Sequence, residues 1–367
     1  MLPIINDDLT VLMNAIHYRP AVSVILPFDS KTNLTSEFQH SLKFAFDEVE
    51  RRLEAEYPGD QAINIMNKLH HLTDQLEVNK RKKGIALFAS PIFEKLVYLN
   101  VEVEPKILVD ESFEIRDLVY DAKESQLHYL LLILGGGECK LFLGNHFHLL
   151  PVKMQIPSTL EAYINDAPQR VTNFSDPDAF KEAQVEKLIR SVDKELSNTL
   201  LKHKLSVFVA GSKSILGVFK SITHNEKNIE NYIEGNYLEK SLNQLHQIIQ
   251  PFILEWKHSR QLKLLQQIED AANQKKLAIG IEQVWNDIYN KKGRLLIVEK
   301  DFMASGEHVN DGFIFYKPTT SENKFSHMHD VVDDAMELIL TNGGDVAFVD
   351  NGLLNSYEHI ALIKYYS

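Results

Sequence analysis

The sequence predicts a mixed α/β fold in three domains, over residues 1–122, 123–258 and 259–367. With 367 residues, the chain is long enough to bury two or three separate cores. Short apolar runs typical of buried strands alternate with longer segments of helical periodicity in the first and last thirds. Between them, three apolar runs separated by glycine turns indicate an antiparallel meander.

The first domain is expected to be an α/β domain that starts with the apolar strand 22–27, which Pro27 closes. The segment 35–56 places apolar residues on one helical stripe and charged residues on the other side, which predicts an amphipathic helix. The further elements of this domain are expected as a helix at 62–76 and strands at 85–89, 95–99 and 106–109.

The middle domain is expected to begin with the meander and to continue with a helix, a strand and a second helix. Its strands are predicted at 129–134, 140–143, 147–152 and 205–210, and its first helix at 178–202. A long helical stretch over 236–273 then leads into the third domain. Pro251 is expected to kink or split this stretch, because proline removes a helical hydrogen bond and clashes with the preceding turn.

The third domain is predicted to open with a helix and a strand and to close with an α-β-α-β unit. Its elements are expected as helices at 280–289 and 331–340, strands at 293–298, 347–349 and 360–365, a polar segment at 303–324 and a short helical piece at 353–357. Gly343 and Gly344 follow the second helix, where a stop requires a residue at positive φ. The last two strands are expected to be parallel, with the short helical piece as their crossover.

Composition limits the classes of protein that the chain can represent. The net charge of −12 argues against general nucleic-acid binding, which needs clustered cations, but it permits local basic patches. The single cysteine, Cys139, excludes an internal disulfide and every multi-cysteine zinc site. The first residues lack the basic and apolar regions of a signal peptide, and no apolar run is long enough to span a bilayer. We therefore expect a soluble, cytoplasmic protein without a membrane partner.

Three strings of the sequence resemble one known family. The first is the C-terminal helix, glycine stop and strand, whose matching residues are Gly343, Gly344, Val346, Phe348, Val349, Leu353, Ile360, Ala361, Lys364 and Tyr365. The second is KKGIALFAS at 82–90, and the third is the strand end at 209–212. With the order of the elements, they resemble the bacterial branch of the archaeo-eukaryotic release-factor family, the relatives of Pelota and of class-one release factors.

The resemblance implies a fold and a function. It implies a ribonuclease-H-like middle domain and a third domain similar to kink-turn-binding ribosomal proteins. It also implies a non-enzymatic factor that binds the ribosomal A site in ribosome hibernation or rescue. A translational GTPase of the elongation-factor-Tu type is the further partner that such a factor implies.

Members of this family that release peptides use a Gly-Gly-Gln tip, which would fall within 153–177 of this chain. That interval contains no glycine, so the Ala-Pro-Gln-Arg string around Gln169 lacks the residues that adopt positive φ freely. The string Gly136-Gly137-Glu138 lies in a predicted hairpin turn and ends in an acid. We therefore expect no peptidyl-tRNA hydrolysis, no catalytic residue, no cofactor and no metal site.

The candidate contacts to ribosomal or transfer RNA are mainly cations, with electrostatic and positional roles. They are Lys80, Arg81, Lys82 and Lys83 in the densest basic run, Gln169 and Arg170 in the loop of the middle domain, and Lys202 and Lys204 after its first helix. The histidine pairs 146/148 and 327/329 are interpreted as surface or packing residues, because no cysteine accompanies them. The string at 210–214 is interpreted as a tight βα turn rather than a phosphate loop.

Two other functions stay open at this stage. A ribonuclease-H-like fold would also suit a nuclease or hydrolase that acts on RNA, although the predicted meander strands carry no carboxylate for a metal. A protein-interaction scaffold that has lost the ribosome would fit the acidic charge of the chain.

Overall fold

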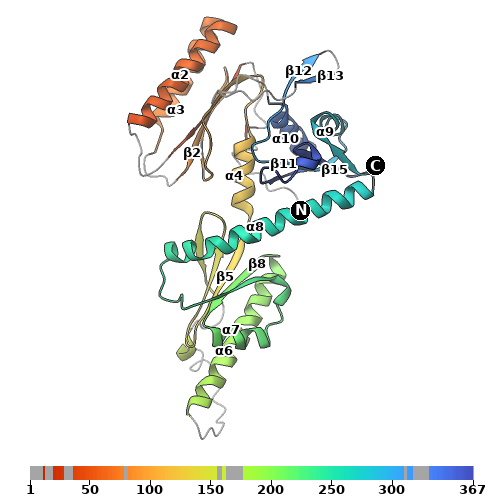
Figure 1. Ribbon diagram of the computed structural model, residues 1–367. Helices are drawn as coiled ribbons and strands as arrows, with labels where there is room; N and C mark the ends of the chain where they lie inside the picture. The colour runs from red at the N-terminus through yellow and green to blue at the C-terminus, as the bar shows by residue number, and fades with distance from the viewer. Residues whose placement is uncertain are drawn as a thin grey trace. The chain divides into compact units, whose positions relative to one another are not determined.

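The computed structural model describes residues 11–12, 20–28, 36–77, 82–154, 159–162, 177–309, 312–316 and 330–366. Helices alternate with strands in several sheets, which confirms the mixed α/β class (Figure 1). The chain divides into two compact units, one made of Met1–Lys123 with Gln261–Ser367 and the other of Glu124–Arg260. The boundaries of the three domains stay a prediction. Among the described helices, none is long and apolar enough to cross a membrane.

The first sheet of the first unit is antiparallel throughout and is covered by two helices. Its strands are β1 (Ala21–Pro27), β2 (Gly84–Ala89), β3 (Glu94–Leu99) and β4 (Lys106–Asp110), in the order β3-β2-β1-β4. The helices are α2 (Ser36–Glu56) and α3 (Gly59–Asp74), and the apolar stripe of α2 joins the core on this sheet. These six elements lie where the sequence predicted them. The helix α4 (Arg116–Gln126), which follows, was not predicted.

The second sheet of this unit mixes parallel and antiparallel pairs. Its strands are β10 (Leu277–Ile279), β11 (Gly293–Glu299), β14 (Asp345–Val349) and β15 (Ile360–Lys364), in the order β10-β15-β11-β14. The helices beside it are α9 (Gly280–Tyr289), α10 (Val331–Thr341) and the 3₁₀ turn η2 (Asn355–Tyr357). A separate hairpin of β12 (Ser305–Val309) and β13 (Gly312–Tyr316) lies in the segment that was expected to be a polar loop.

The predicted parallel arrangement of the last two strands is wrong. β11 pairs with β14 in parallel and with β15 in antiparallel orientation, so β14 and β15 run in opposite directions on either side of β11. Only residues 350–359 connect them. A parallel connection needs a dozen or more residues, usually with a full helix, and this linker contains only a 3₁₀ turn.

The second unit contains one five-stranded sheet between two helical layers. Its strands are β5 (Tyr129–Leu134), β6 (Cys139–Gly144), β7 (Leu149–Val152), β8 (Ser206–Gly211) and β9 (Ile229–Glu234), in the order β7-β6-β5-β8-β9. The predicted meander β5-β6-β7 is antiparallel, whereas β5, β8 and β9 are parallel. The strand β9 was not predicted. Its helices are α6 (Pro177–Lys202), α7 (Lys213–Ile222) and the first part of α8 (Leu242–Asn273), with the 3₁₀ turn η1 (Glu226–Asn228) before β9.

The central strand β5 buries both of its faces, as its unbroken apolar sequence predicts. Its alternate residues Leu130, Leu132 and Leu134 pack with α6 and α7. The intervening residues, Tyr129, Leu131 and Ile133, pack with α8. This two-sided core explains why helices cover both faces of the sheet (Figure 1).

The expected helix over 236–273 begins later than predicted and is not split. It starts at Leu242 and continues through Pro251. The buried residues Ile249, Ile253 and Trp256 lie on both sides of the proline and pack into the same core. Burial of these side chains offsets the hydrogen bond that the proline removes.

Candidate functional site

The described part of the basic run consists of Lys82 and Lys83, just before β2. The ammonium group of Lys82 donates a hydrogen bond to Asn100 Oδ1 at 2.6 Å. Asn100 donates in turn to the Asp121 carboxylate on α4, from its backbone N–H at 2.6 Å and from its side chain at 3.2 Å. Lys82 is therefore held in a fixed position by a chain of hydrogen bonds that ends on α4.

Asp121 is the buried end of this chain and is 5% exposed. Burial raises the pKa of Asp121, while the hydrogen bonds from Asn100 and Val101 and the charge of Lys82 oppose this rise. Lys83 differs from Lys82, because half of its side chain is exposed and its ammonium group pairs with Glu102 at 2.7 Å. An exposed pair of this kind is weak, so Lys83 can exchange Glu102 for a phosphate at little cost.

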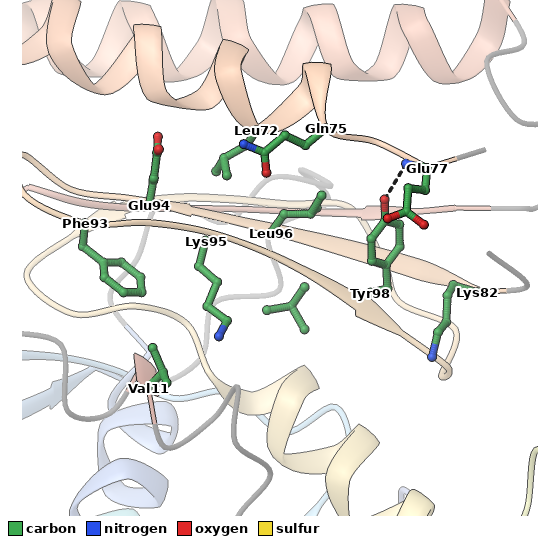
Figure 2. A pocket seen from close by; sticks show the side chains of 11 residues that line it. Val11, Leu72, Gln75, Glu77, Lys82, Phe93, Glu94, Lys95, Leu96 and Tyr98 are labelled. Atoms are coloured by element: carbon green, nitrogen blue, oxygen red, sulfur yellow. Dashed lines mark hydrogen bonds between the residues drawn. The ribbon is translucent and has the colours of Figure 1, made fainter. Parts of the chain in front are cut away.

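A pocket of about 780 Å³ lies beside Lys82 along β3, the outer strand of the first sheet. Its lining residues are Val11, Leu72, Gln75, Glu77, Lys82, Phe93, Glu94, Lys95, Leu96, Val97 and Tyr98. Figure 2 shows residues from both faces of β3, with Leu72 and Gln75 above the strand and Val11 below it. Tyr98 accepts a hydrogen bond from the backbone N–H of Glu77 at 2.7 Å, which ties the end of the α3 segment to the strand.

The second described group of candidate cations lies in the other unit. Lys202 is the last residue of α6, and Lys204 lies in the link to β8. Both are exposed, and Leu201 beside them is 85% exposed. The helix dipole favours a cation near the C-terminus of a helix, so the charge of Lys202 is stabilised where it stands. Because its side chain is exposed, it is accessible to a ligand.

Lys80, Arg81, Gln169 and Arg170 lie outside the described residues. The structure therefore brings together Lys82 and Lys83 in one unit and Lys202 and Lys204 in the other. The histidines 327 and 329 also lie outside the described residues, and His146 and His148 lie in the turn before β7 rather than on a strand. Among the residues that the structure describes, no three His, Cys, Asp or Glu side chains form a group that could hold a metal ion.

A buried polar cluster in the second unit was not found from the sequence. Asp193, on α6, accepts hydrogen bonds from Thr223 Oγ1 at 2.6 Å, Asn225 Nδ2 at 2.9 Å and the His224 backbone at 3.1 Å. These donors close the turn between α7 and β9. The only sequence signal is an acid within the apolar stripe of α6, between Ile189 and Leu196, where a solvent-facing acid would not be expected.

Residues 128–292 match the sequence model of the bacterial archaeo-eukaryotic release factor family 3. The predicted family resemblance is confirmed over this range: residues 128–292 are release-factor-like. The matched range begins just before β5 and extends through α9. It includes Lys202 and Lys204 but not Lys82 and Lys83. No curated protein matches the chain in sequence.

Several solved structures of translation factors are similar to this chain. An archaeal translation termination factor, aRF1, is 13% identical, with 98% of this chain and 96% of that chain covered and a TM-score of 0.24. A ribosome-bound archaeal Pelota with ABCE1 is 11% identical, with 98% and 94% covered and a TM-score of 0.42. Dom34 from S. cerevisiae is 12% identical, with 78% and 74% covered and a TM-score of 0.38. These superpositions are loose, and the family resemblance comes from the sequence match over residues 128–292.

Proposed function

We propose that this release-factor-like chain is a ribosome-associated factor that acts in ribosome hibernation or rescue by occupying the A site, without hydrolysing peptidyl-tRNA. The observation that carries the proposal is the family match over residues 128–292, which includes the whole five-stranded sheet of the second unit. Fold alone does not determine function, so the proposal also depends on the residues that the chain has and lacks.

The absence of a Gly-Gly-Gln sequence supports the part of the proposal that excludes hydrolysis. The interval 153–177, between β7 and α6, contains no glycine. A tripeptide tip that must place its backbone against a transfer-RNA end needs glycines for close approach and positive φ. Gly136 and Gly137 lie in the β5–β6 hairpin turn, and the residue after them is the acid Glu138 rather than a glutamine. The missing glycines therefore support the proposal that the chain does not supply this chemistry at a ribosomal site.

The described cations support binding to RNA. Lys202 and Lys204 are exposed at the end of α6, and Lys83 is exposed beside the held Lys82. Lysines contact phosphates as point charges and position a protein on RNA without reading its sequence. The net charge of −12 keeps the rest of the surface from binding RNA in general. The family resemblance also leads us to propose a translational GTPase of the elongation-factor-Tu type as a second partner.

The test is co-sedimentation of the purified chain with bacterial 70S ribosomes across a salt series. Wild type is compared with K82Q/K83Q and K202Q/K204Q. Matched controls are K43Q/K263Q and K194Q/K213Q, which remove the same charge at other exposed lysines. If both candidate groups contact phosphates, each double variant weakens binding and lowers the slope of log K against log salt by about 2, whereas the controls do not. No saturable binding of wild type at low salt would overturn the proposal.

The catalytic part is tested on the same material. Ribosomes that carry labelled peptidyl-tRNA in the P site are incubated with the chain, and released peptide is counted against buffer alone. We expect no release above buffer, with a conventional release factor and a stop codon as the positive control. The RNA is also examined for breaks in Mg²⁺ and Mn²⁺. Release of peptide or metal-dependent cleavage would contradict the non-enzymatic assignment.

A further inference from the structure

Two lysine doublets of the first unit each follow the end of a helix, with the same turn geometry. Lys275 and Lys276 follow α8, and Lys291 and Lys292 follow α9. The first lysine of each doublet has a positive φ, 59° for Lys275 and 58° for Lys291. The second lysine closes the turn, since its N–H donates to a carbonyl five residues earlier, at 2.8 Å for Lys276 and 2.9 Å for Lys292. Glycine or asparagine usually occupies the left-handed position of such a turn, so lysine there is uncommon.

The sheet brings the two doublets together. One doublet leads into β10 and the other into β11, and these strands flank β15. The N–H of Lys364 donates to Lys276 O at 2.8 Å, and the N–H of Tyr365 donates to Lys292 O at 3.0 Å. Figure 1 shows the C-terminal end of α8 beside β15. Segments that are far apart in sequence therefore meet at one end of this sheet.

Six cations gather at this end of the sheet: Lys275, Lys276, Lys291, Lys292, Arg294 and Lys364. Lys292 and Lys364 share the Asp287 carboxylate, each at 3.2 Å. The other four make no ion pair or side-chain hydrogen bond to another described residue. The neighbouring acid Asp345 pairs with Lys123, and the acid Asp270 lies on the last turns of α8. Cations therefore outnumber acids here, although the chain as a whole is acidic.

Three tyrosines lie among these cations and expose their rings. Tyr289, at the end of α9, is 69% exposed, Tyr365 is 49% exposed and Tyr366 is 56% exposed. The hydroxyl of Tyr365 donates to Gly343 O at 3.4 Å. Exposed aromatic side chains between cations are what single-stranded nucleic acids bind, because unpaired bases stack on the rings while the phosphates contact the cations.

We propose that these six cations and three tyrosines, the basic–tyrosine patch, bind single-stranded RNA. The binding of a single-stranded polyanion rests on the patch alone, whereas the choice of RNA over DNA rests on the proposed function. In a duplex the base faces are already stacked, so the tyrosines contribute only to single strands. The patch belongs to a different unit from Lys202 and Lys204 and to a different sheet from Lys82 and Lys83.

The experiment measures fluorescence anisotropy of a labelled single-stranded RNA of about 12 nucleotides, which is within the range of single-strand sites. The same sequence is also measured as single-stranded DNA and as an RNA duplex. The charge variant is K275N/K276Q/K291N/R294Q, with asparagine at the left-handed positions so that the turns are kept. Its matched control is K194Q/K213Q/K227Q/K240Q, which removes four exposed lysines from the other unit. The ring variants are Y289A/Y365A/Y366A and the conservative Y289F/Y365F/Y366F.

We expect the charge variant to lose at least about tenfold in affinity and to lower the salt slope by about 3, since each neutralised phosphate contributes about 0.7 for a single strand. The alanine ring variant should lose about tenfold or more on single-stranded RNA and little on the duplex, and the phenylalanine variant should bind like wild type. Circular dichroism confirms that each variant is folded, and K291N/R294Q is used if the fourfold variant is not.

Equal losses in the charge variant and its control, or equal losses of the alanine ring variant on single strands and duplex, would overturn the proposal. Equal binding of an acidic peptide would also overturn it, because the patch would then be a general polyanion site. Stronger binding of the DNA strand would overturn the choice of RNA. Ribosomes are absent from this assay, so its failure leaves the co-sedimentation result standing, and a chain that fails to sediment can still bind the strand.

Discussion

Asp333 on α10 accepts a hydrogen bond at 2.7 Å from the backbone N–H of Arg116, the first residue of α4. The same carboxylate also accepts from the N–H of Ile115 at 3.0 Å. The guanidinium group of Arg116 pairs with Asp330 and donates to the carbonyl of Phe302. A carboxylate from one part of the chain therefore satisfies the N–H groups at the start of a helix more than 200 positions away, where the helix dipole also favours a negative charge.

Arg116→Met should destabilise the first unit by about 3–5 kcal/mol, because it leaves Asp330 buried without its counter-charge, whereas Glu114 keeps its pair with Lys106. The chain has two tryptophans, Trp285 in α9 of the first unit and Trp256 in the second. Urea unfolding followed by Trp285 fluorescence in a W256F background therefore reports on the first unit. The control is Lys123→Met on the same helix, whose partly exposed pair with Asp345 is worth about 0–1 kcal/mol. Similar losses of unfolding free energy in the two variants would show that the buried ion pair contributes no more to stability than the partly exposed pair.

The pH dependence of the first unit should reflect Asp333. Burial, with the nearby carboxylates Glu114 and Asp330, raises the pKa of Asp333 well above its usual range and outweighs the charge of Arg116 and the hydrogen bond from the Ile115 N–H, which act in the opposite direction. The folded state then holds this proton more tightly than the unfolded chain does. The contribution of Asp333 to stability is largest below the ordinary aspartate pKa and is lost as pH rises through the raised value. The difference in unfolding free energy between wild type and D333N should therefore fall as pH rises from about 4. A constant difference between pH 4 and 8 would refute the raised pKa.

The pH dependence of the stability of the second unit should have the opposite sign, because of Asp193. Burial by itself would raise the pKa of Asp193, but the hydrogen bonds from Thr223, Asn225 and His224 outweigh it, and the pKa is lowered. Its contribution to stability is present above the unfolded pKa and is lost as pH falls through the lowered value. The difference between wild type and D193N, followed by Trp256 in a W285F background, should shrink on acidification below about pH 4. A difference that grows on acidification would be incompatible with this hydrogen-bonded carboxylate.

Adding a side chain at either of the two glycines after α10 should destabilise the first unit, but by a different mechanism at each position. Gly343 has a φ of 81° and open space around its Cα, so G343A should cost about 1 kcal/mol of backbone strain and G343N less. At Gly344, a Cβ would lie 2.6 Å from Ile339 Cγ1 and 3.0 Å from Gly293 O. G344A should cost about 1–3 kcal/mol through overpacking, and G344N should not restore stability. Equal behaviour of the two asparagine variants in Trp285-detected unfolding would contradict this distinction.

The elements with strong periodicity could be predicted from the sequence. The helix at Gly280–Tyr289 lies where its apolar pattern placed it, and so does the antiparallel meander of the second unit. The strand Ile229–Glu234 was missed, because it is short and only one of its residues, Ile233, is fully buried. The direction of β15 was wrong because direction depends on which strand it pairs with, and local pattern does not contain that information.

The site residues were harder to predict than the fold. The basic run at 80–83 is conspicuous in sequence, but the structure describes only Lys82 and Lys83, and both have partners in the chain. The basic–tyrosine patch has no sequence signature, since its doublets and tyrosines become neighbours only through the pairing of β15 with β10 and β11. Likewise, Asp333 and Asp334 are adjacent acids in the first turn of α10, where acids usually face solvent, and yet Asp333 is 3% exposed. Tertiary contacts decide such cases.

Tyr129 and Gly144 are directly opposite each other in the β5–β6 pair, and the tyrosine ring lies over the Cα of the glycine. The Tyr129 hydroxyl is buried and has no hydrogen-bond partner among the described residues. Its ring packs edge-on against Phe208 and Trp256, at centroid distances of 5.4 and 6.2 Å. Burying a hydroxyl without a partner costs about 1–3 kcal/mol, so the ring is what stabilises this core.

Tyr129→Phe should therefore leave the second unit as stable as wild type or stabilise it by about 1 kcal/mol, because the ring contacts remain and the unpaired hydroxyl is removed. Gly144→Ala should cost about 1–3 kcal/mol, since its Cβ would lie 2.4 Å from Tyr129 Cζ. Both are measured by urea unfolding with Trp256 fluorescence in the W285F background. A loss of more than about 1 kcal/mol in Y129F would show that the hydroxyl has a partner, such as an ordered water, that stabilises the core.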